Sequence, residues 1–326
     1  MRYVIAGTGI VSSTYVHAIA EIDGSELAGC ISRSGRSPEA APDLPSWPDI
    51  DSVSVDYDAV IVATPNGLHC EGIVAAANRG KHVITEKPLG VNREEMDRAI
   101  AACEAAGVTL AVAYQHRTAP DNRALKSLID QGAFGTIFAA DLAGKFYRDQ
   151  AYYDMADYRG SRAMDGGGAF TQQASHNLDV YTWFFGLPER VLAVTDTFAH
   201  EMEAEDHGAA LLQYANGMIG TVIASTVARP GYAARLEVHT SKGSFTLTDD
   251  VITNWDVEGV PNPSDASFDY QHDGATSFAV GDYSAHLEIV RDFERAVETG
   301  GKPIVDAHSA RATTELICRI YEAAEA

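Results

Sequence analysis

The chain contains few cysteines and no long apolar run, and each of these absences excludes a class of protein. Its four cysteines lie far apart and form no CxxC pair, so neither a zinc ribbon nor a disulfide framework is indicated. No apolar stretch approaches the length of about 18 residues that a membrane-spanning helix needs. We therefore expect a cytoplasmic protein with neither a signal peptide nor a membrane anchor.

Basic side chains are also scarce. The 326 residues include 46 acidic and 24 basic side chains, of which only six are lysines, and the formal net charge is -22. Nucleic acid is not an expected partner, because this charge repels a polyanion. His200, His207 and His239 show no HxH or HxxxH spacing, so no metal site is predicted. With 46% hydrophobic and 21% charged residues, the chain has a globular composition, and its length suits two domains.

A short apolar run near the N-terminus ends in a glycine-rich turn. Residues 3–6 are followed by Gly7-Thr8-Gly9-Ile10-Val11-Ser12 and then by a helical pattern. Gly7 allows a tight turn, and Gly9 lets a pyrophosphate approach the backbone amides at the helix N-terminus. Ser12 stands where the dinucleotide fingerprint has its third glycine, and it is small enough for close helix packing. The pattern favours a dinucleotide site over an ordinary turn.

The end of the second predicted strand bears on the choice of cofactor. Residues 27–31 are followed by Ser32, Arg33 and Ser34, with no carboxylate among them. An acidic residue here would bind the ribose of NAD, whereas an arginine can hold the extra phosphate of NADP. We therefore expect NADP as the preferred cofactor. NAD stays open, because a solvated arginine after a strand gives the same pattern.

Strands and helices alternate through the first third of the chain. Strands are predicted at 58–63, 81–85 and 108–113, and helices at 70–79 and 93–106. This alternation is typical of a doubly wound parallel sheet, in which ligands lie beyond the carboxyl ends of the strands. The residues expected at these ends are Gly7, Arg33, Thr64, Lys87 and Gln115.

Three motifs together resemble the Gfo/Idh/MocA family of oxidoreductases. They are Gly7-Thr8-Gly9, Ala63-Thr64-Pro65-Asn66-Gly67-Leu68-His69 and Glu86-Lys87-Pro88-Leu89. The resemblance continues through Gln115-His116-Arg117 and Gly166-Gly167-Gly168-Ala169, and so covers almost the whole chain. It implies an N-terminal Rossmann domain over 1–118 and a C-terminal α+β domain over 119–326. The cofactor contacts that we expect are Gly7, Gly9, Ile10, Ser32, Arg33, Ser34, Thr64, Pro65, Asn66, His69, Glu86, Lys87 and Gln115.

The second domain is predicted to contain mainly antiparallel strands. The family's sheet is open-faced and pairs subunits, so the resemblance implies a homodimer or homotetramer. Residues 254–282 are rich in Asp, Pro and Gly and are expected to be irregular. The predicted strands are 136–145, 190–197, 209–214, 218–226, 234–240 and 243–248, and the predicted helices are 123–131, 170–185, 286–298 and 307–325.

The candidate chemistry of the second domain lies in the predicted helix 170–185. Gln172, His176 and Asp179 have the spacing of one helix face. His176 matches the family's catalytic histidine, whereas many relatives have aspartate in place of Gln172. An amide is neither an acid nor a base, so proton transfer is expected to depend on His176. The triple glycine before this helix is expected to let a ligand or another backbone come close.

Lys87 is the second candidate catalytic residue. It is expected to hydrogen-bond the reacting oxygen, and Glu86 is expected to orient it. The resemblance further implies a cis Lys87-Pro88 bond. A surface lysine beside a loop proline is the alternative for this tripeptide alone.

Candidate substrate contacts come from two segments. Tyr153 and Arg159 lie in the polar, aromatic stretch 147–164, which resembles the family's substrate loop. With Gln172 and Asp179 they are the expected substrate contacts. The alternative is a solvated loop with packed tyrosines.

The resemblance implies an NAD(P)-dependent oxidoreductase. It would transfer hydride between a nicotinamide and a secondary alcohol or ketone of a sugar, inositol or nucleotide sugar. One alternative is a non-catalytic dinucleotide-sensing regulator of the same fold, and another is dihydrodiol or imine-type reduction. The lysine–histidine pair at 87 and 176 favours the enzyme, since fold alone does not establish function.

Overall fold

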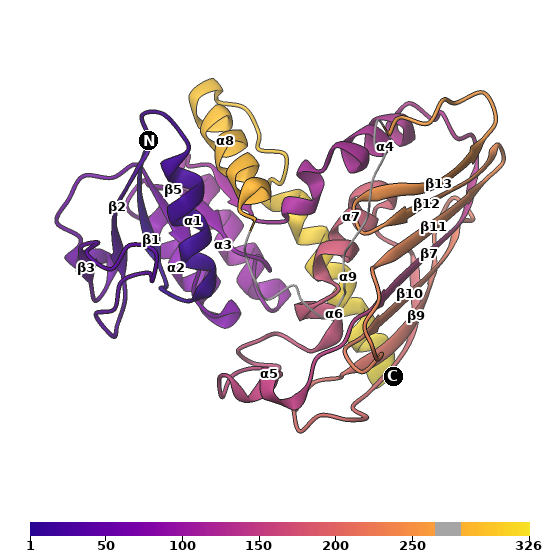
Figure 1. Ribbon diagram of the computed structural model, residues 1–326, viewed down its shortest axis with the longest axis horizontal. Helices are drawn as coiled ribbons and strands as arrows, with labels where there is room; N and C mark the ends of the chain where they lie inside the picture. Colours follow the sequence, from indigo (N-terminus) through magenta and orange to yellow (C-terminus); the bar gives the residue numbers. More distant parts are fainter. Residues whose placement is uncertain (265–281) are drawn as a thin grey trace. The chain divides into compact units, whose positions relative to one another are not determined.

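The computed structural model describes residues 1–264 and 282–326 (Figure 1). The described residues form two compact units, one of 1–115 with 282–311 and the other of 116–264 with 312–326. The sequence placed the boundary at 118/119 and assigned everything beyond it to the second domain. The structure instead returns α8 (Ser284–Thr299) to the first unit, where it contacts α1 (Ile10–Ala20). The C-terminal helix α9 (Ala307–Glu325) is divided between the units after Arg311.

The first unit is built on a six-stranded sheet in the order β3-β2-β1-β4-β5-β6. All neighbouring strands in it are parallel, so the predicted doubly wound architecture is confirmed. The short strand β3 was not predicted. The strands are β1 (Arg2–Ala6), β2 (Glu26–Ile31), β3 (Ser46–Trp47), β4 (Ala59–Val62), β5 (His82–Thr85) and β6 (Leu110–Val112).

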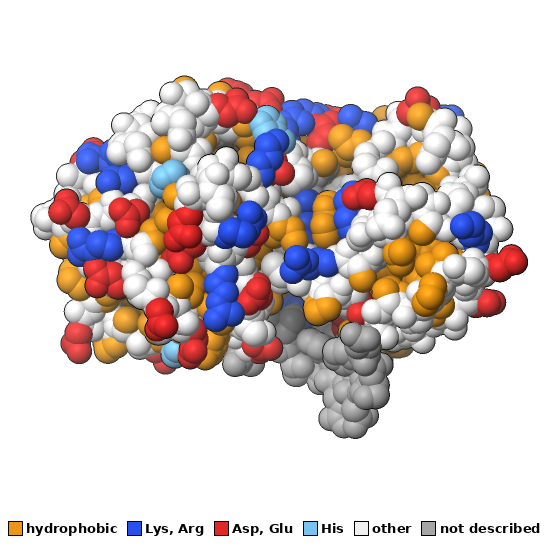
Figure 2. Space-filling model, turned by 90° about the horizontal axis from the view of Figure 1, so that it is seen from above, with side chains coloured by type: hydrophobic (Ala, Val, Ile, Leu, Met, Phe, Trp, Pro, Cys, Tyr) orange, Lys and Arg blue, Asp and Glu red, His pale blue; other side chains and the backbone are white. Residues whose placement is uncertain are grey.

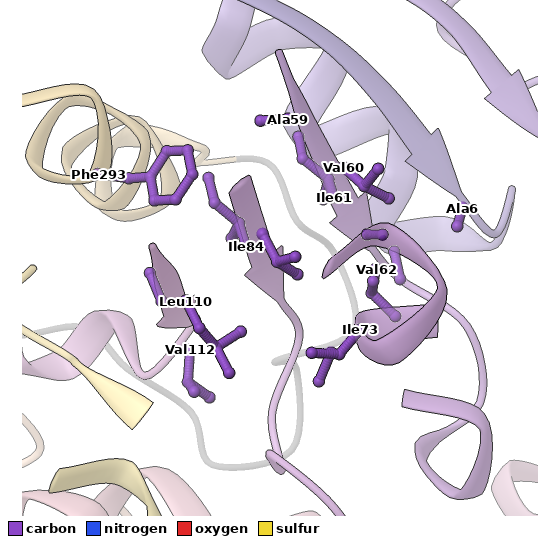
Figure 3. Packing of buried hydrophobic residues seen from close by; sticks show 14 of the residues in the cluster. Ala6, Ala59, Val60, Ile61, Val62, Ile73, Ile84, Leu110, Val112 and Phe293 are labelled. Atoms are coloured by element: carbon purple, nitrogen blue, oxygen red, sulfur yellow. The ribbon is translucent and has the colours of Figure 1, made fainter. Parts of the chain in front are cut away.

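Helices cover this sheet, and buried apolar side chains of the strands and helices form one cluster. Every residue of β4 is buried, as expected for a parallel strand covered on both faces. Figure 3 shows Phe293 of α8 packed in the same cluster as Ile84 of β5. Besides α1 and α8, the helices are α2 (His69–Ala77) and α3 (Arg93–Ala106), with the 3-10 turns η1 (Ile50–Ser52) and η2 (Asn66–Leu68).

Local signals account well for α3. The Asn92 side chain accepts a hydrogen bond from the Glu95 amide at 3.0 Å and so caps the helix. Gly107 ends it in the left-handed conformation, with a φ of 66°. The helix spans 93–106, and that prediction is confirmed.

The second unit is built on a seven-stranded sheet in the order β13-β12-β11-β7-β10-β9-β8. Only β7 and β10 pair in parallel, and the other neighbours are antiparallel, so the predicted open-sheet class is confirmed. The strands are β7 (Ile137–Lys145), β8 (Arg190–Asp196), β9 (His207–Gln213), β10 (Ile219–Ser225), β11 (Arg235–Thr240), β12 (Gly243–Thr248) and β13 (Val251–Val257).

Strand β13 falls partly in the segment predicted to be irregular. In the sequence, Asn254 and Asp256 interrupt the alternation of polar and apolar residues. In the structure, β13 pairs with β12, with a shift of register near Thr246. A bulge of this kind breaks the period of two that identifies a strand. Of the stretch predicted to be irregular, 265–281 lies outside the described residues.

The helix predicted over 170–185 is two helices. A break at Gln173 and Ala174 separates α6 (Ala169–Gln172) from α7 (Ser175–Phe185), so Gln172 and His176 do not share one helix. The prediction that Gln172 shares a helix face with His176 and Asp179 is therefore wrong, while His176 and Asp179 lie three residues apart on α7. The remaining helices of the unit are η3 (Gln115–Thr118), which straddles the boundary, α4 (Pro120–Asp130) and α5 (Gln150–Asp154).

Two further observations concern membrane-spanning helices and surface charge. No helix in 1–264 or 282–326 combines the length and the apolar character needed to cross a bilayer. Figure 2 shows acidic and basic side chains intermingled on the face in view.

Candidate functional site

Two glycines shape the turn between β1 and α1. Gly7 has a φ of 100°, and a Cβ there would lie 2.3 Å from the Ala63 carbonyl oxygen, so the fold itself requires glycine. Gly9 has an extended backbone, and a Cβ there would meet nothing within 4 Å. It adjoins the N-terminus of α1, which no side chain caps. Room at Gly9 and a helix N-terminus without a side-chain cap fit a dinucleotide phosphate.

The other predicted cofactor residues of this unit lie at the ends of neighbouring strands. Ile10 opens α1 and is 57% exposed. Ser32 Oγ lies 3.5 Å from Thr8 Oγ1, while the side chain of Arg33 is exposed. The remaining candidates follow β2, β4 and β6 within a few residues along the chain, and they are Ser32, Arg33, Ser34, Thr64, Pro65, Asn66 and Gln115.

His69 is the first residue of α2. It is fully buried, and its ring nitrogens lie 2.7 Å from the Pro88 carbonyl oxygen and 2.9 Å from that of Thr64. Burial lowers the pKa of this imidazole. The ring therefore ties the end of β4 to the turn after Lys87. This placement favours a supporting role over the predicted contact with the cofactor.

The Glu86 carboxylate, next to Lys87 in the chain, is 12% exposed and accepts contacts from two helices of the first unit. Tyr15 of α1 donates a hydrogen bond to Glu86 Oε1 at 2.8 Å, and His286 Nε2 of α8 lies 3.4 Å from the same oxygen. Burial raises the pKa of Glu86, but His286, Tyr15 and Lys87 together lower it by more, so the group stays ionised.

The turn after Glu86 leads directly into the candidate catalytic lysine. The Lys87 amide donates to Glu86 Oε2 at 3.3 Å, and the Lys87-Pro88 bond is cis, as expected. Because the Glu86 carboxylate already accepts bonds from its own unit, its position favours orienting Lys87 over contacting the cofactor. Tyr15 and His286 were not predicted, since they lie 71 and 200 residues away in the chain from Glu86.

In the second unit, the His176 ring stacks on that of His116. The ring centroids are 4.7 Å apart, and the planes are inclined by 14°. His176 is the second residue of α7, while His116 belongs to η3. His116 appeared in a sequence motif without a role, because nothing in the sequence placed it beside His176.

Asp179 lies on the same helix, in the protein interior. Arg117 Nε and Nη2 each donate to it at 2.6 Å, and Thr313 Oγ1 donates to it at 2.8 Å. The side chains of Arg117 and Asp179 are both fully buried. This bidentate pair favours a structural role for Asp179 over the predicted contact with substrate.

The glycines before α6 serve a buried carboxylate. A Cβ on Gly168 would lie 1.7 Å from the Glu205 carbonyl oxygen. Glu205 also accepts hydrogen bonds from the amides of Gly168 and Phe170 and from the Tyr321 hydroxyl. Of the two expectations for these glycines, the structure supports the close approach of another part of the chain. Glu205 was not predicted, because its partners lie more than 30 residues away.

Gln172 and Arg159 are the predicted substrate residues with partly exposed side chains. Gln172 Nε2 donates to the Asp165 carbonyl oxygen at 2.6 Å. The Arg159 guanidinium lies over the Tyr152 ring at 4.2 Å from its centroid. Both stay candidates for contact with substrate.

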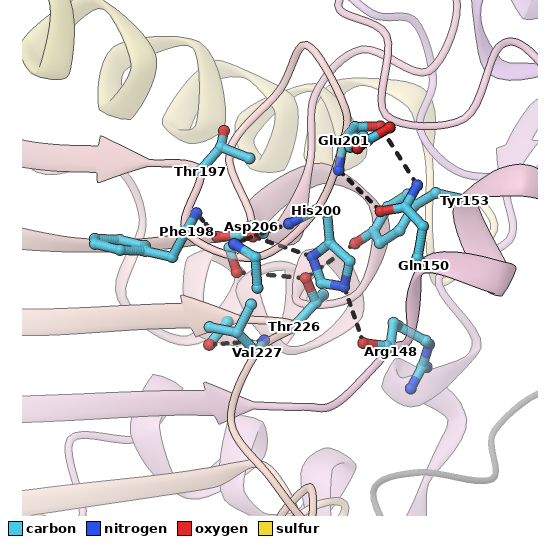
Figure 4. A network of polar contacts seen from close by, with 12 residues as sticks. Arg148, Gln150, Tyr153, Thr197, Phe198, His200, Glu201, Asp206, Thr226 and Val227 are labelled. Atoms are coloured by element: carbon cyan, nitrogen blue, oxygen red, sulfur yellow. Dashed lines mark hydrogen bonds and ion pairs between the residues drawn. The ribbon is translucent and has the colours of Figure 1, made fainter.

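Tyr153 is only 4% exposed and belongs to a polar network (Figure 4). Its hydroxyl lies 2.9 Å from Thr226 Oγ1, and its ring lies 4.6 Å from that of His200. Burial raises its pKa. The alternative of a packed tyrosine is favoured over the predicted contact with substrate.

His200 and Asp206 belong to the same polar network. His200 Nδ1 lies 3.0 Å from Asp206 Oδ2, which also accepts the amides of Ala199 and His200. His200 Nε2 lies 3.0 Å from the Arg148 carbonyl oxygen. Across the part of the chain that the structure describes, no group of three or more His, Cys, Asp or Glu could hold a metal ion.

Two family models match the chain, and both agree with this architecture. Residues 1–114 match an oxidoreductase family with an NAD-binding Rossmann fold, and residues 122–246 match a GFO/IDH/MocA C-terminal domain. Together the two matches span most of both units.

Named relatives are similar at low identity. The chain is 29% identical over 272 residues to D-xylose 1-dehydrogenase (NADP(+)) 2 of Haloferax volcanii, which covers 82% of this chain and 78% of that protein. It is 27% identical over 325 residues to scyllo-inositol 2-dehydrogenase (NAD(+)) of Bacillus subtilis, covering 94% and 88%. The solved WlbA dehydrogenase of Bordetella pertussis, in complex with NADH and UDP-GlcNAcA, is 28% identical with a TM-score of 0.86, covering 99% of this chain and 96% of that chain.

Proposed function

Because the chain belongs to the Gfo/Idh/MocA oxidoreductase family, we propose that it is an NAD(P)-dependent dehydrogenase of a secondary alcohol in a sugar, inositol or nucleotide sugar. The relatives named above act on or bind compounds of these three kinds. The observation that carries the proposal is the Glu86 carboxylate, which is 12% exposed and accepts a hydrogen bond from Tyr15, directly before Lys87 at the end of a parallel strand. A lysine that directly follows this carboxylate, beyond the carboxyl end of a parallel strand, suits a reaction in which oxygen gains negative charge.

Each residue has one task in the proposed oxidation. Lys87 Nζ donates a hydrogen bond to the reacting oxygen and stabilises the charge that develops there. The His176 imidazole accepts the hydroxyl proton, and the carbon–oxygen bond becomes a carbonyl. Bound NAD(P)+ supplies the acceptor for the hydride that leaves the carbon. In the reverse reaction His176 returns the proton to the alkoxide oxygen.

We propose NADP as the preferred cofactor. Arg33 is exposed after the end of β2, and its chain neighbours are Ser32 and Ser34, not a carboxylate that would bind a ribose hydroxyl or repel a phosphate. The Haloferax relative is named for NADP, whereas the Bordetella structure contains NADH. Comparing kcat/KM for the two cofactors in wild type and Arg33→Ala tests this preference. A loss confined to NADP is expected, and an equal loss for both would contradict it.

The proposed assembly is a homodimer or homotetramer formed through the open face of the second sheet. Apolar side chains alternate toward solvent on neighbouring strands, among them Leu192 and Val194 of β8, Leu211 of β9 and Ile219 of β10. Exposed apolar surface of this kind marks interaction sites. Light scattering of wild type and Leu211→Asp tests the assembly, and a wild-type monomer would contradict it.

The first experiment is nicotinamide absorbance after mixing the protein with NADP or NAD and a panel of free sugars, inositols and UDP-sugars. Reduction with any member of the panel supports the dehydrogenase and identifies both substrate class and cofactor. The alternative is a non-catalytic dinucleotide sensor, for which the Lys87–Glu86 arrangement has no use. Tight dinucleotide binding with no turnover in either direction, ketones included, would favour that sensor.

A further inference from the structure

His116 has no task in the proposed reaction, yet its ring covers a face of the His176 imidazole. The centroid distance of 4.7 Å and the inclination of 14° describe nearly parallel rings in contact. Both residues belong to the second unit, His116 in η3 and His176 in the first turn of α7. Any charge on His116 is therefore felt at His176.

Asp250 contacts the His116 ring, and Asn122 binds both Asp250 and the His116 backbone. His116 Nδ1 lies 3.0 Å from Asp250 Oδ1, in the turn between β12 and β13. Asn122 Nδ2 of α4 donates to the same Asp250 oxygen at 2.8 Å and to the His116 carbonyl oxygen at 2.9 Å. The side chain of His116 is 24% exposed and that of Asp250 is 29% exposed. Asn122 of α4 thus holds the carboxylate that contacts this ring and the backbone that carries it.

The charges around His116 favour its protonated form. Burial lowers the pKa of this imidazole, but the carboxylates of Asp250, Asp249 and Asp179 raise it by more, so the pKa lies above its ordinary value. Asp179 is bonded to Arg117 on its other side, and Asp249 accepts a hydrogen bond from the Ala234 amide. Asp250 is therefore the carboxylate that directly faces the ring.

We propose that His116 is a positioning residue for His176: Asp250 keeps the His116 ring in place and positively charged, and this ring disfavours a second positive charge on the imidazole stacked against it. His176 then stays neutral near neutral pH, ready to accept a proton. The catalytic consequence rests on the proposed function, but the electrostatic coupling between the rings does not.

The coupling is tested by NMR titration of histidine-labelled protein, with the His176 signal assigned from its loss in His176→Gln. His116→Phe keeps an aromatic ring and removes the charge, so the apparent pKa of His176 is expected to rise by about one unit. His116→Arg keeps both a planar group and a charge, and it is expected to leave that pKa within about 0.3 units of wild type. His176 titrating in His116→Phe as in wild type would overturn the proposal, as would equal shifts in His116→Phe and His116→Arg.

Asp250→Asn provides a second test that leaves the His116 ring in place. Loss of the carboxylate removes the support for the His116 charge, so the His176 pKa is expected to rise in the same direction as in His116→Phe. Asp256→Asn, an exposed carboxylate on β13 of the same hairpin, is the matched control and is expected to cause no shift. A shift in the control as large as that in Asp250→Asn would count against the specific pair.

The pH profile separates this proposal from the proposed function. For alcohol oxidation, the acid limb of kcat/KM is expected to move to higher pH by about one unit in His116→Phe and to stay in place in His116→Arg. The NMR shift without turnover on any substrate would support the coupling and contradict the dehydrogenase. Turnover with an unchanged acid limb in His116→Phe would support the dehydrogenase and overturn the role of His116.

Discussion

The two units place their polar side chains by different means. In the first unit, short motifs end parallel strands, and the backbone brings those ends to one edge of the sheet. In the second unit, Asp179, which the sequence predicted as a ligand contact, is buried and bonded to Arg117, and the unpredicted Glu205 is likewise bonded to other parts of the chain. Spacing along the chain therefore indicates a ligand site in the first unit and a folding contact in much of the second.

Removing a candidate catalytic group tests the chemistry of each unit and should give the largest effect. Lys87→Ala and His176→Ala are each expected to lower turnover on the order of 10²- to 10⁴-fold with dinucleotide binding retained. Steady-state kinetics and fluorescence titration with the cofactor measure the two properties. Lys81→Ala is the matched control. Lys81 directly precedes β5, and its ammonium group donates a hydrogen bond to the Tyr57 carbonyl oxygen. Wild-type turnover in either test variant would exclude that residue from the reaction.

Breaking the Arg117–Asp179 pair tests whether Asp179 supports the fold. Asp179→Asn leaves the buried guanidinium uncompensated, and the free energy of unfolding is expected to fall by about 3–5 kcal/mol. Urea unfolding measures it. The control Asp130→Asn removes an exposed partner of Lys126 and is expected to cost about 0–1 kcal/mol. A raised KM with unchanged stability would instead support the substrate contact that the sequence predicted.

Glu86 gives the first unit a pH-dependent contribution to stability. Because its folded-state pKa lies below its ordinary value of about 4.3, this contribution is present above that pH and is lost as pH falls through the folded-state pKa. Tyr15→Phe removes a hydrogen bond to the charged group, so a loss of about 1.5–3 kcal/mol is expected at pH 7 and a smaller one near pH 3.

Thermal or urea unfolding at the two pH values checks this prediction. Tyr283→Phe is the control, since its hydroxyl bonds the exposed Glu21 at 3.1 Å and little change is expected. An equal loss in Tyr15→Phe at both pH values would show that packing of the hydroxyl, and not the Glu86 charge, is responsible.

Gly7 and Gly9, in the turn between β1 and α1, are expected to differ in what they support: Gly7 the fold and Gly9 the binding of the dinucleotide. Gly7→Ala is expected to destabilise the protein by about 1–3 kcal/mol, because it combines a positive φ with a close carbonyl oxygen. Gly9→Ala should preserve stability and weaken dinucleotide binding about tenfold, or about 1.4 kcal/mol. Unfolding and binding titrations separate the two outcomes. Unchanged affinity in Gly9→Ala would argue against a phosphate at the helix N-terminus.

Much of the fold could be predicted from local pattern. The parallel strands are continuous apolar runs, and α3 begins at an asparagine cap and ends at a glycine, all within a few residues of the positions concerned. The antiparallel strands were predicted from the alternation of polar and apolar residues. Strand β13 is the exception, because a register shift and two polar residues interrupt its alternation. The helix 170–185 was predicted as continuous because its break contains neither proline nor glycine.

The amino-acid sequence by itself determined the doubly wound sheet, the glycine turn and the lysine at a strand end, because each depends on neighbouring residues and on a regular period. Only the tertiary structure decided that Glu86 is held by Tyr15 and His286, that Asp179 is paired inside, and that His116 lies on His176. These contacts join residues about 60 to 200 positions apart in the chain, as the 62-residue separation of Arg117 and Asp179 illustrates. Burial and charge pairing depend on which distant segments pack together, and no local pattern carries that information.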